Sequence, residues 1–562
     1  MENLEGKELI RKTQSVCPEC LKQIDAYIIV DDLEGKDAVL MRKVCDDHGF
    51  FEDIISRNVS EYLKNQEYYH DYMPIENKNN MKDSGMGCPH NCGMCAEHKS
   101  SPCIALIDVT NRCNLACPIC FANANNKGYI VEPSIEELRQ IFQHFRDIKP
   151  TPPVMLQLSG GEPTVREDLP EIIRMGKEMG FVEIMLTTNG VKLAARNGVE
   201  YIKELVDAGM DAIYLSFDSA DDPEVLKKTR GVDLLKLKHR VIENCRKADF
   251  GGVALVPVIA KGVNDHQVGP ILDFAARNRD VIMGIIFQPV SLCGRIDNEQ
   301  IRELRYTTSD LSEAIGQATG DDNMYIYPIP ATSNMTKLMG WYDFAPQFTM
   351  ASHPDCGFAT VMIANEENGK MNWHRIEDWF EVDQLFEWVE KVWAMVEKRE
   401  WPNLTEKFIG PLAKLFGNKI GDFINQASDF AYRKAIKAYF MAGAMQCLKG
   451  MDGPIKQFIP LMLSPKLETA GAFFETGNNL MISSMHFQDV YNFDTERVSR
   501  CLVHYGVIDP DDPSKVLQVP FCAMNSIHRE NIEKKLCKTP IDVDPADVTA
   551  KAAEWVKREV GE

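Results

Sequence analysis

Residues 113–120 read CNLACPIC and place three cysteines on one short loop, at the spacing CxxxCxxC. With 17 cysteines in 562 residues, such a pattern should arise by chance roughly 0.015 times, and the chain contains it twice. Three thiolates on a tight loop can hold three irons of a cubic [4Fe-4S] cluster, so that the fourth iron stays open to a small molecule. Cys113, Cys117 and Cys120, called the 113–120 triplet below, therefore predict a catalytic cluster site.

The second copy of this spacing is CPHNCGMC at residues 88–95, and its Cys88, Cys92 and Cys95 form the 88–95 triplet. A further cysteine, Cys103, follows shortly after it. Because fully coordinated clusters take four cysteines, we expect Cys103 to complete a closed auxiliary [4Fe-4S] cluster here.

After Cys120 the hydrophobic pattern alternates between short apolar runs and amphipathic helices, which is typical of a parallel α/β sheet. The predicted strands cover residues 103–110, 154–158, 182–188, 212–218, 253–260 and 281–290. The predicted helices cover residues 135–148, 167–179, 199–208, 234–247 and 266–276. Right-handed crossovers would arrange these units as a six-unit (β/α) partial TIM barrel, with functional groups at the carboxyl ends of the strands.

Polar residues follow the predicted strands at these ends. SGGEPT at 159–164 follows the second strand; its glycines would let the backbone approach a ligand, and Glu162 could accept from an ammonium group. TTNG at 187–190 follows the third strand. Further polar side chains at strand ends are Ser216, Asp218 and Gln288. We therefore expect a polar ring above the 113–120 triplet.

Through CNLACPIC, SGGEP, TTNG and the six βα units, residues 104–295 resemble the radical S-adenosylmethionine (SAM) superfamily. In that superfamily three cysteines hold a [4Fe-4S] cluster whose open iron chelates SAM, and a 5′-deoxyadenosyl radical then takes hydrogen from unactivated carbon. The resemblance implies that the 113–120 triplet holds this cluster. It also implies that the SAM pocket is lined by Gly160, Gly161, Glu162, Thr188, Asn189, Ser216, Asp218 and Gln288.

Motifs outside the barrel narrow the resemblance. CPEC, CDDHG, CPHNCGMC, HPDCGF and MHFQDVYNF are similar to motifs of archaeal tetraether lipid synthases, which are multi-cluster radical SAM enzymes. The similarity implies joining of isoprenoid chain termini of archaeal ether phospholipids into tetraether lipids, with a reduced ferredoxin-like electron donor. Relatives of these enzymes methylate 7,8-dihydro-6-hydroxymethylpterin in methanopterin biosynthesis, so pterin C-methylation is the alternative.

Three cysteines near the N-terminus predict a mononuclear metal site. CPEC supplies Cys17 and Cys20, and CDDHG supplies Cys45; the three are called the knuckle cysteines. Soft ligands on two short turns suit a rubredoxin-like iron or a structural zinc. His48 is a candidate fourth ligand, and an exposed turn histidine is the alternative.

Three further cysteines, Cys356, Cys501 and Cys522, are candidate ligands of a second auxiliary cluster and are called the C-terminal cysteines. Cys447 and Cys537 compete for its fourth position. Cys245 lies on a predicted helix, and we expect it to be a buried core thiol.

These features predict five regions along the chain. They are a rubredoxin-like or zinc-like metal domain at 1–60, a linker with auxiliary-cluster cysteines at 61–103, the barrel at 104–295, a helical, aromatic-rich region covering the barrel at 296–480, and a C-terminal cluster-binding region at 481–562. Apolar residues between 385 and 396 recur at helical spacing, which predicts an amphipathic helix packing on the barrel.

The formal charge of −21 would repel phosphate backbones over most of the surface, which argues against a nucleic-acid partner. No apolar run reaches the ~20 residues of a membrane span, and the charged N-terminus lacks a signal-peptide pattern, so we expect a cytoplasmic protein. The basic stretch at 227–240 could bring peripheral contact with lipid phosphates, although a solvated helix face is the favoured interpretation.

Overall fold

The computed structural model describes residues 7–76, 85, 87–93, 95–125, 128–295, 301–342, 349–400, 429–449, 479–537, 539–540 and 543–561. Its N-terminal unit is a four-stranded antiparallel sheet in the order β1-β2-β3-β4. The strands are β1 (Glu8–Val16), β2 (Gln23–Leu33), β3 (Lys36–Cys45) and β4 (Gly49–Ser56). Helix α1 (Val59–Gln66) follows, with its N-terminus capped by the Asn58 side chain.

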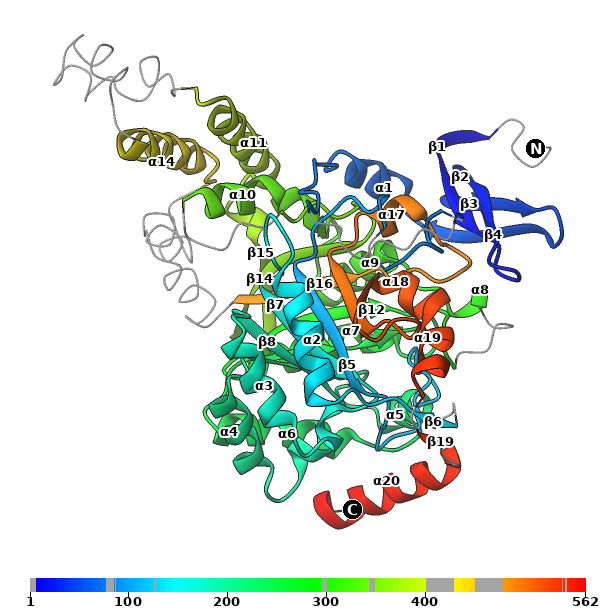
Figure 1. The fold of residues 1–562 in the computed structure, drawn as a ribbon. Coiled ribbons are helices and arrows are strands. Elements are labelled where there is room, and N and C mark those ends of the chain that lie inside the picture. The colour runs from blue at the N-terminus through cyan, green and yellow to red at the C-terminus, as the bar shows by residue number, and fades with distance from the viewer. Residues whose placement is uncertain are drawn as a thin grey trace, which may run out of the picture.

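The second sheet has 13 strands, and its centre consists of the six strands expected from the sequence. They pair in parallel and are β5 (Ile104–Thr110), β7 (Met155–Gly160), β8 (Glu183–Thr188), β9 (Ala212–Ser216), β10 (Val253–Val256) and β12 (Ile282–Pro289), with the short β11 (Val258–Ile259) beside β12. The partial-barrel prediction is confirmed, because each crossover between these strands carries helical structure (Figure 1).

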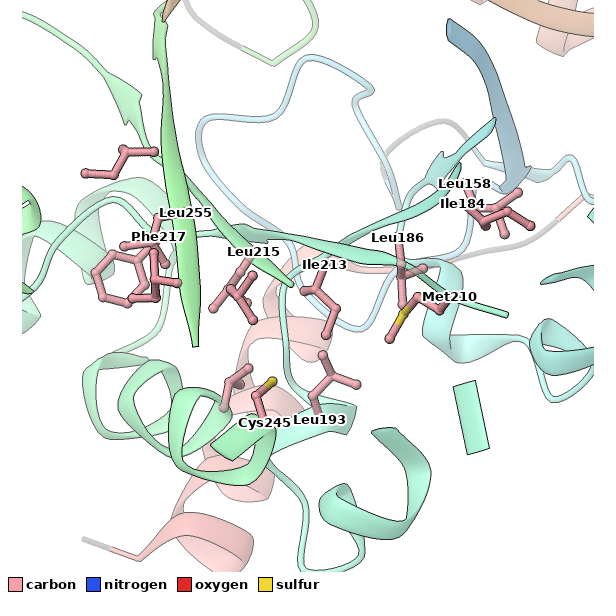
Figure 2. Close-up of a cluster of buried hydrophobic side chains, with 14 of the residues drawn as sticks. Leu158, Ile184, Leu186, Leu193, Met210, Ile213, Leu215, Phe217, Cys245 and Leu255 are labelled. Carbon is pink, nitrogen blue, oxygen red and sulfur yellow. The ribbon is translucent and has the colours of Figure 1, made fainter. Parts of the chain in front are cut away.

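The helices of these crossovers cover one face of the sheet. They are α2 (Ile135–Arg146), α3 (Leu169–Glu178), α4 (Gly198–Ala208), α5 (Pro223–Arg230), α6 (Leu235–Lys247) and α7 (Val268–Arg277). Ser134 and Glu137 form the predicted capping box at the start of α2. The largest core lies between these helices and the sheet, and Figure 2 shows part of it, from Leu158 to Leu255. Cys245 belongs to this core, as expected.

The sheet continues beyond the six predicted strands on both sides. Strand β16 (Asn479–Met485) pairs in parallel with β12, and β17 (Val503–Ile508) pairs in parallel with β5. Antiparallel strands then complete the edges; they are β13 (Tyr327–Pro328), β14 (Gly357–Glu367), β15 (Lys370–Arg375) and β18 (Val516–Pro520). The predicted boundaries at 295 and 480 therefore do not interrupt the sheet, since later segments return to cover its edges.

Further helices come from the second half of the chain. They are α8 (Ile301–Leu304), α9 (Thr308–Thr319), α10 (Ser333–Trp341), α11 (Val382–Lys398), α14 (Asp429–Gln446), α17 (Thr495–Ser499), α18 (Phe521–Ala523), α19 (Arg529–Leu536) and α20 (Pro545–Val560). The helix predicted over 385–396 is part of α11, which packs on α10 and α14 (Figure 1). A short β19 (Thr539–Pro540) pairs with β6 (Tyr129–Ile130). Residues 401–428 and 450–478 of the predicted aromatic-rich region lie outside the described residues.

The N-terminal sheet is joined to the main body by a buried ion pair network. Arg305 is 1% exposed and donates to Asp489 at 2.8 Å and to Asp53 on β4. Lys43 on β3 donates to the carbonyl of Val490 at 2.7 Å. Among the described segments, no helix is both long and apolar enough to cross a membrane.

Candidate functional site

The 113–120 triplet lies on the loop that follows β5, at the carboxyl edge of the sheet. The Asn125 side chain fixes this loop: its amide nitrogen donates to the carbonyls of Cys113 at 2.7 Å and Leu115 at 2.9 Å. From the segment after β12, Arg295 donates to the carbonyl of Cys117 at 2.7 Å. Neither Asn125 nor Arg295 stood out in the sequence, because their roles depend on loops that meet only in the fold.

The sulfurs of the triplet are close enough to influence one another. Burial raises the pKa of the Cys113 thiol, and the neighbouring Cys117 and Glu162 raise it further. Burial also raises the pKa of the Cys117 thiol, which the Arg230 guanidinium opposes. A thiolate is the form that binds iron, so a half-buried cation beside these sulfurs favours that form.

Arg230 is held in place by Asp218, a predicted lining residue. Its guanidinium donates to the two Asp218 oxygens at 2.6 and 2.8 Å, and Asp218 is fully buried. The sequence predicted a solvated face or a lipid contact for the stretch that contains Arg230. This is wrong for Arg230 at the end of α5 and for the fully buried Lys238 on α6, whereas Lys227 on the same stretch is exposed.

The glycine pair after β7 lets two loops approach each other. A Cβ atom on Gly160, whose φ is +133°, would lie 2.0 Å from the carbonyl oxygen of Thr110. A Cβ on Gly161 would lie 2.3 Å from the carbonyl oxygen of Arg112. The backbone of Gly161 donates to Thr110 at 2.8 Å. The glycines therefore let the backbone approach the cluster loop, whereas the sequence predicted that they would let it approach a ligand.

Glu162 likewise binds protein groups rather than presenting a free carboxylate. It is 1% exposed, and one oxygen accepts from the hydroxyls of Thr164 at 2.6 Å and Thr188 at 2.7 Å. The other oxygen accepts from the backbone of Asn189 at 2.7 Å. Burial raises the pKa of Glu162, and these hydrogen bonds oppose the shift. These contacts connect the ends of β7 and β8. Neither oxygen of Glu162 is exposed for the predicted contact with an ammonium group.

Asn189 and Ser216 are linked through a buried lysine. Lys238 donates to the carbonyl of Asn189 at 2.7 Å and to the hydroxyl of Ser216 at 3.0 Å. The Asn189 side chain donates to Asn114 on the cluster loop at 2.7 Å. Burial lowers the pKa of Lys238 to about 7. Lys238 therefore connects the strand ends below the triplet, a role that no sequence motif signalled.

The face of the sheet opposite the helices is called the inner face. Ile107 and its alternate neighbours pack in the helix-covered core, so the residues between them point to the inner face. Half-buried polar side chains on this face, toward the carboxyl ends of the strands, are Asp108, Gln157, Thr187, Tyr214, Ser216 and Gln288. Thr187, Ser216 and Gln288 come from the stretches that the sequence predicted to form the polar ring, whereas Asp108, Gln157 and Tyr214 were not singled out by the sequence.

A second charged group borders this ring. Arg529 on α19 is 5% exposed and forms an ion pair with Asp108 at 2.5 Å. Its guanidinium carbon lies 4.9 Å from the centre of the Tyr505 ring on β17. The Nη2 nitrogen of Arg529 is buried without a hydrogen-bond partner in the described part of the chain. An unpaired buried donor beside half-buried polar side chains is a candidate ligand contact.

The knuckle cysteines come together with His48, as the sequence proposed. The four ligand atoms all lie within 4.8 Å of one another. The His48 Nδ1 lies 3.6 Å from the Cys17 sulfur and 3.5 Å from the Cys45 sulfur. The interaction with His48 lowers the pKa of the Cys45 thiol to about 7. Three sulfurs and one nitrogen at this separation fit a single tetrahedral ion.

The 88–95 triplet lines a buried cavity that Cys103 does not reach. The cavity is also lined by His98, His504 and Gln518. Cys103 precedes β5, and its thiol donates to the carbonyl of Leu502 at 3.5 Å. The structure therefore brings the triplet together and does not bring the predicted fourth ligand to it.

The C-terminal cysteines also gather, although they come from three distant segments. Burial raises the pKa of the Cys501 thiol, and the nearby Cys522 and Cys356 thiols raise it further. The Arg497 guanidinium opposes a similar shift of the Cys356 pKa. Cys92 of the 88–95 triplet is close enough that Cys501 raises its pKa. Two cysteine groups are therefore neighbours, which sequence separation concealed.

The distances between ligand atoms distinguish a site for a single metal ion from a site for an iron–sulfur cluster. Among the described residues, only the knuckle cysteines with His48 have all ligand atoms within 4.8 Å. Thiolates that bind different irons of a cluster lie farther apart than ligands of one ion. The 113–120 triplet, half-buried next to a guanidinium, accordingly fits the [4Fe-4S] cluster implied by the sequence resemblance.

Comparison with known proteins gives matches along most of the chain. A family model of the radical SAM superfamily matches residues 107–275, and one described as the HMPTM N-terminal zinc ribbon domain matches residues 9–57. A 7,8-dihydro-6-hydroxymethylpterin dimethyltransferase from Methanocaldococcus jannaschii is 38% identical, over 93% of this chain and 95% of that protein. A probable GTP 3′,8-cyclase from Sulfolobus acidocaldarius is 33% identical, over 38% of this chain and 63% of that protein.

Solved structures also match part of the chain. Streptococcus suis SuiB bound to S-adenosylmethionine aligns with a TM-score of 0.31 and 20% identity, over 40% of this chain and 48% of that one. Methylornithine synthase aligns with a TM-score of 0.30 and 15% identity, over 40% of this chain and 64% of that one.

Proposed function

The chain belongs to the radical SAM superfamily, and from this premise we propose that it methylates carbon of a reduced pterin of the 7,8-dihydro-6-hydroxymethylpterin class. The observation that carries this proposal is the similarity to the pterin dimethyltransferase over 93% of the chain. A shared catalytic barrel alone would not distinguish substrates. The similarity extends beyond the barrel to the N-terminal metal domain and the C-terminal cysteine region.

When bound, the [4Fe-4S] cluster and SAM supply the one-electron chemistry that activates an otherwise inert carbon. The 113–120 triplet would hold the cluster, while Asn125 and Arg295 keep the loop in one conformation. Arg230 stabilises negative charge at the sulfurs, and Asp218 keeps Arg230 oriented. We propose that the predicted lining residues, from Gly160 on β7 to Gln288 on β12, face bound SAM or support the residues that do.

The inner face suits a polar heterocycle. A pterin presents adjacent N–H donors and a carbonyl acceptor on its pyrimidine edge, which a carboxylate and a guanidinium complement. Asp108 and Arg529 offer this pair beside the polar ring, and Arg529 has a buried N–H without a partner. Arg529 was not singled out by the sequence. We propose that these two side chains recognise the pterin edge.

Coupling of lipid chains was the leading prediction from the sequence, and the comparisons favour the alternative. An isoprenoid chain would need apolar surroundings at the reacting carbon. The inner face holds both kinds of surface: Gln157 and Thr187 are joined by a 2.8 Å hydrogen bond, whereas Ala254, Val256 and Ile286 form an apolar cluster, so the similarity to the pterin enzyme carries the choice. A reduced ferredoxin-like donor remains the proposed electron source for either substrate.

Anaerobic incubation of the iron-loaded protein with SAM and dithionite tests the proposal. With the dihydropterin present, mass spectrometry should detect methylated pterin together with 5′-deoxyadenosine from the SAM that is cleaved and S-adenosylhomocysteine from the SAM that donates the methyl group. No 5′-deoxyadenosine under any condition would overturn the radical chemistry. Hydrogen loss from an archaeal diether phospholipid, with unchanged pterin, would instead establish the lipid reaction.

The Arg529→Lys variant tests the substrate contact. It should keep uncoupled cleavage of SAM, because the described hydrogen bonds of Arg529 are with Asp108, Glu533 and Asn525 and not with the 113–120 triplet, but it should methylate pterin more slowly. The exposed Arg558 on α20 provides the control, and Arg558→Lys should behave as the wild type. Equal loss of SAM cleavage and methylation in Arg529→Lys would contradict a role in substrate recognition.

A further inference from the structure

The 88–95 triplet needs a fourth ligand if it holds a fully coordinated cluster. Cys103, the nearest cysteine along the chain, is tied to β17 by two contacts. Its backbone nitrogen donates to the carbonyl of Leu502 at 2.9 Å, and its thiol donates to the same oxygen at 3.5 Å. It is absent from the lining of the cavity that contains the triplet. Cys501, the C-terminal cysteine near Cys92, is also absent from this lining, and its thiol donates to the carbonyl of Val503 at 3.1 Å. A ligand of another chemical type must therefore be sought in the lining.

Two imidazoles face each other in this cavity. The rings of His98 and His504 lie with their centres 4.4 Å apart and their planes at 75°. Both residues are almost fully buried, at 5% and 1% exposure. Histidine is, after cysteine, a ligand that iron–sulfur centres accept.

His504 is already fixed by both ring nitrogens. Gln518 donates to its Nδ1 at 2.6 Å, and its Nε2 donates to the carbonyl of Cys501 at 3.0 Å. The Gln518 carbonyl in turn accepts from His144 on α2 at 3.3 Å, which agrees with this amide orientation. His504 is thus a neutral imidazole with no lone pair left for a metal, and its ring forms a wall against which His98 packs.

His98 is placed by the same turn that carries the last cysteine. It follows Cys95 by three residues, and its backbone nitrogen donates to the carbonyl of Cys95 at 3.3 Å. We propose that the imidazole of His98 is the fourth ligand of an auxiliary [4Fe-4S] cluster held by the 88–95 triplet, and that His504 is a positioning residue for it. This assignment concerns the proposed auxiliary cofactor and does not depend on the identity of the substrate.

The electrostatic surroundings agree with a neutral fourth ligand. Besides the triplet, the described residues that line the cavity are apolar, hydroxyl, amide or imidazole groups, and no lysine or arginine is among them. A fourth thiolate would add another negative charge to this site, whereas an imidazole adds none. Exchange of thiolate for imidazole also raises the reduction potential of a cluster. The auxiliary cluster would accept electrons more readily than one with four cysteines.

Pulsed electron paramagnetic resonance of the full-length, iron-loaded protein tests the assignment. The protein is prepared with [15N]histidine and reduced with dithionite in the absence of SAM, so that no SAM nitrogen can contribute. A 15N nucleus strongly coupled to a reduced cluster is the expected result. Absence of such coupling in the wild-type protein would overturn the proposal.

Two variants locate the nitrogen. His98→Cys should retain the iron content, lose the 15N coupling and lower the reduction potential of one cluster; His98→Gln should lose the coupling as well. His528, which donates to the carbonyl of Pro89 within the 88–95 segment at 2.9 Å, supplies the control, and His528→Gln should keep the coupling. Coupling that persists in either His98 variant would overturn the proposal. The pterin assay measures reaction products and not 15N coupling, so a failure of the proposed function can be told apart from a failure of this ligand assignment.

Discussion

The two triplets share the spacing CxxxCxxC, yet the structure surrounds them with different charged groups. At the 113–120 triplet the half-buried Arg230 lies beside the sulfurs and is oriented by Asp218, and Glu162 is close to Cys113. At the 88–95 triplet the nearby charged groups include Glu97 and Asp494, and two imidazoles line the cavity. A spacing fixes how many sulfurs meet in one loop. The neighbours, which come from distant segments, decide what the site can do.

The two triplets also differ in their exposure to solvent. The 113–120 triplet is partly exposed at the carboxyl edge of the sheet, beside the polar inner face. The 88–95 triplet precedes the sheet, and Cys92 and Cys95 are buried. We therefore infer that the first site binds a small molecule and that the second carries electrons or stabilises the fold.

Loss of one sulfur from each triplet should give the largest contrast. Cys117→Ala should abolish formation of 5′-deoxyadenosine, because its cluster would lose one of only three protein ligands. Cys92→Ala should leave measurable SAM cleavage and reduce iron content. Chromatographic assay of 5′-deoxyadenosine, with iron determined per chain, checks both. Equal loss in the two variants would show that the sites depend on each other.

A methyl group on the glycine pair should disturb only the 113–120 triplet. In Gly161→Ala the new Cβ would meet the Arg112 carbonyl at 2.3 Å, so the cluster loop must shift. A displacement of about 1 Å can cost about 100-fold in rate, and we expect a loss of this order in SAM cleavage. Gly269→Ala on α7, where the nearest atom is a side-chain Cβ at 3.2 Å, is the control. Full activity of Gly161→Ala would contradict the close approach of these loops.

The cation beside the first triplet can be tested through its partner. Asp218→Asn leaves the half-buried Arg230 without its ion pair to a fully buried carboxylate, and breaking a buried pair costs about 3–5 kcal/mol of folding stability. The exposed pair of Glu224 and Lys227 on the same helix is the control, and Glu224→Gln should leave stability unchanged. Unfolding midpoints of both variants check this. Similar stability of the two variants would show that Asp218 contributes no more than a surface charge.

The sequence predicted the core of the fold because local patterns determine it. The six central strands and the capping box at Ser134 follow from hydrophobic periodicity and helix-capping chemistry within short windows. Strands β16 and β17 were missed, since a short apolar run does not reveal which edge of a distant sheet it will join.

For the candidate site, too, the sequence predicted what lies within one short stretch and missed contacts between distant segments. Cysteine spacing identified the triplets and the knuckle set, including His48. It gave Cys103 a role that the fold does not support, because Cys103 belongs to the edge of β5. Arg230 and Lys238 resembled surface charges in the sequence; their contacts with Asp218 and with the Asn189 carbonyl depend on helices α5 and α6 packing over the strand ends.

The smallest expected effect concerns the buried Lys238 below the first triplet. Burial lowers its folded-state pKa to about 7, whereas an unfolded lysine titrates near pH ~10.4, so between these values the unfolded chain binds more protons. Stability should therefore rise with pH in this window, by at most about 1.4 kcal/mol per pH unit from this group. Lys238→Met should remove that slope, measured as unfolding midpoints from pH 7.5 to 9.5. The exposed Lys236 on the same helix is the control. Since Lys236 stays in water, Lys236→Met should keep the slope, and an unchanged slope in Lys238→Met would mean that Lys238 is solvated in the folded protein.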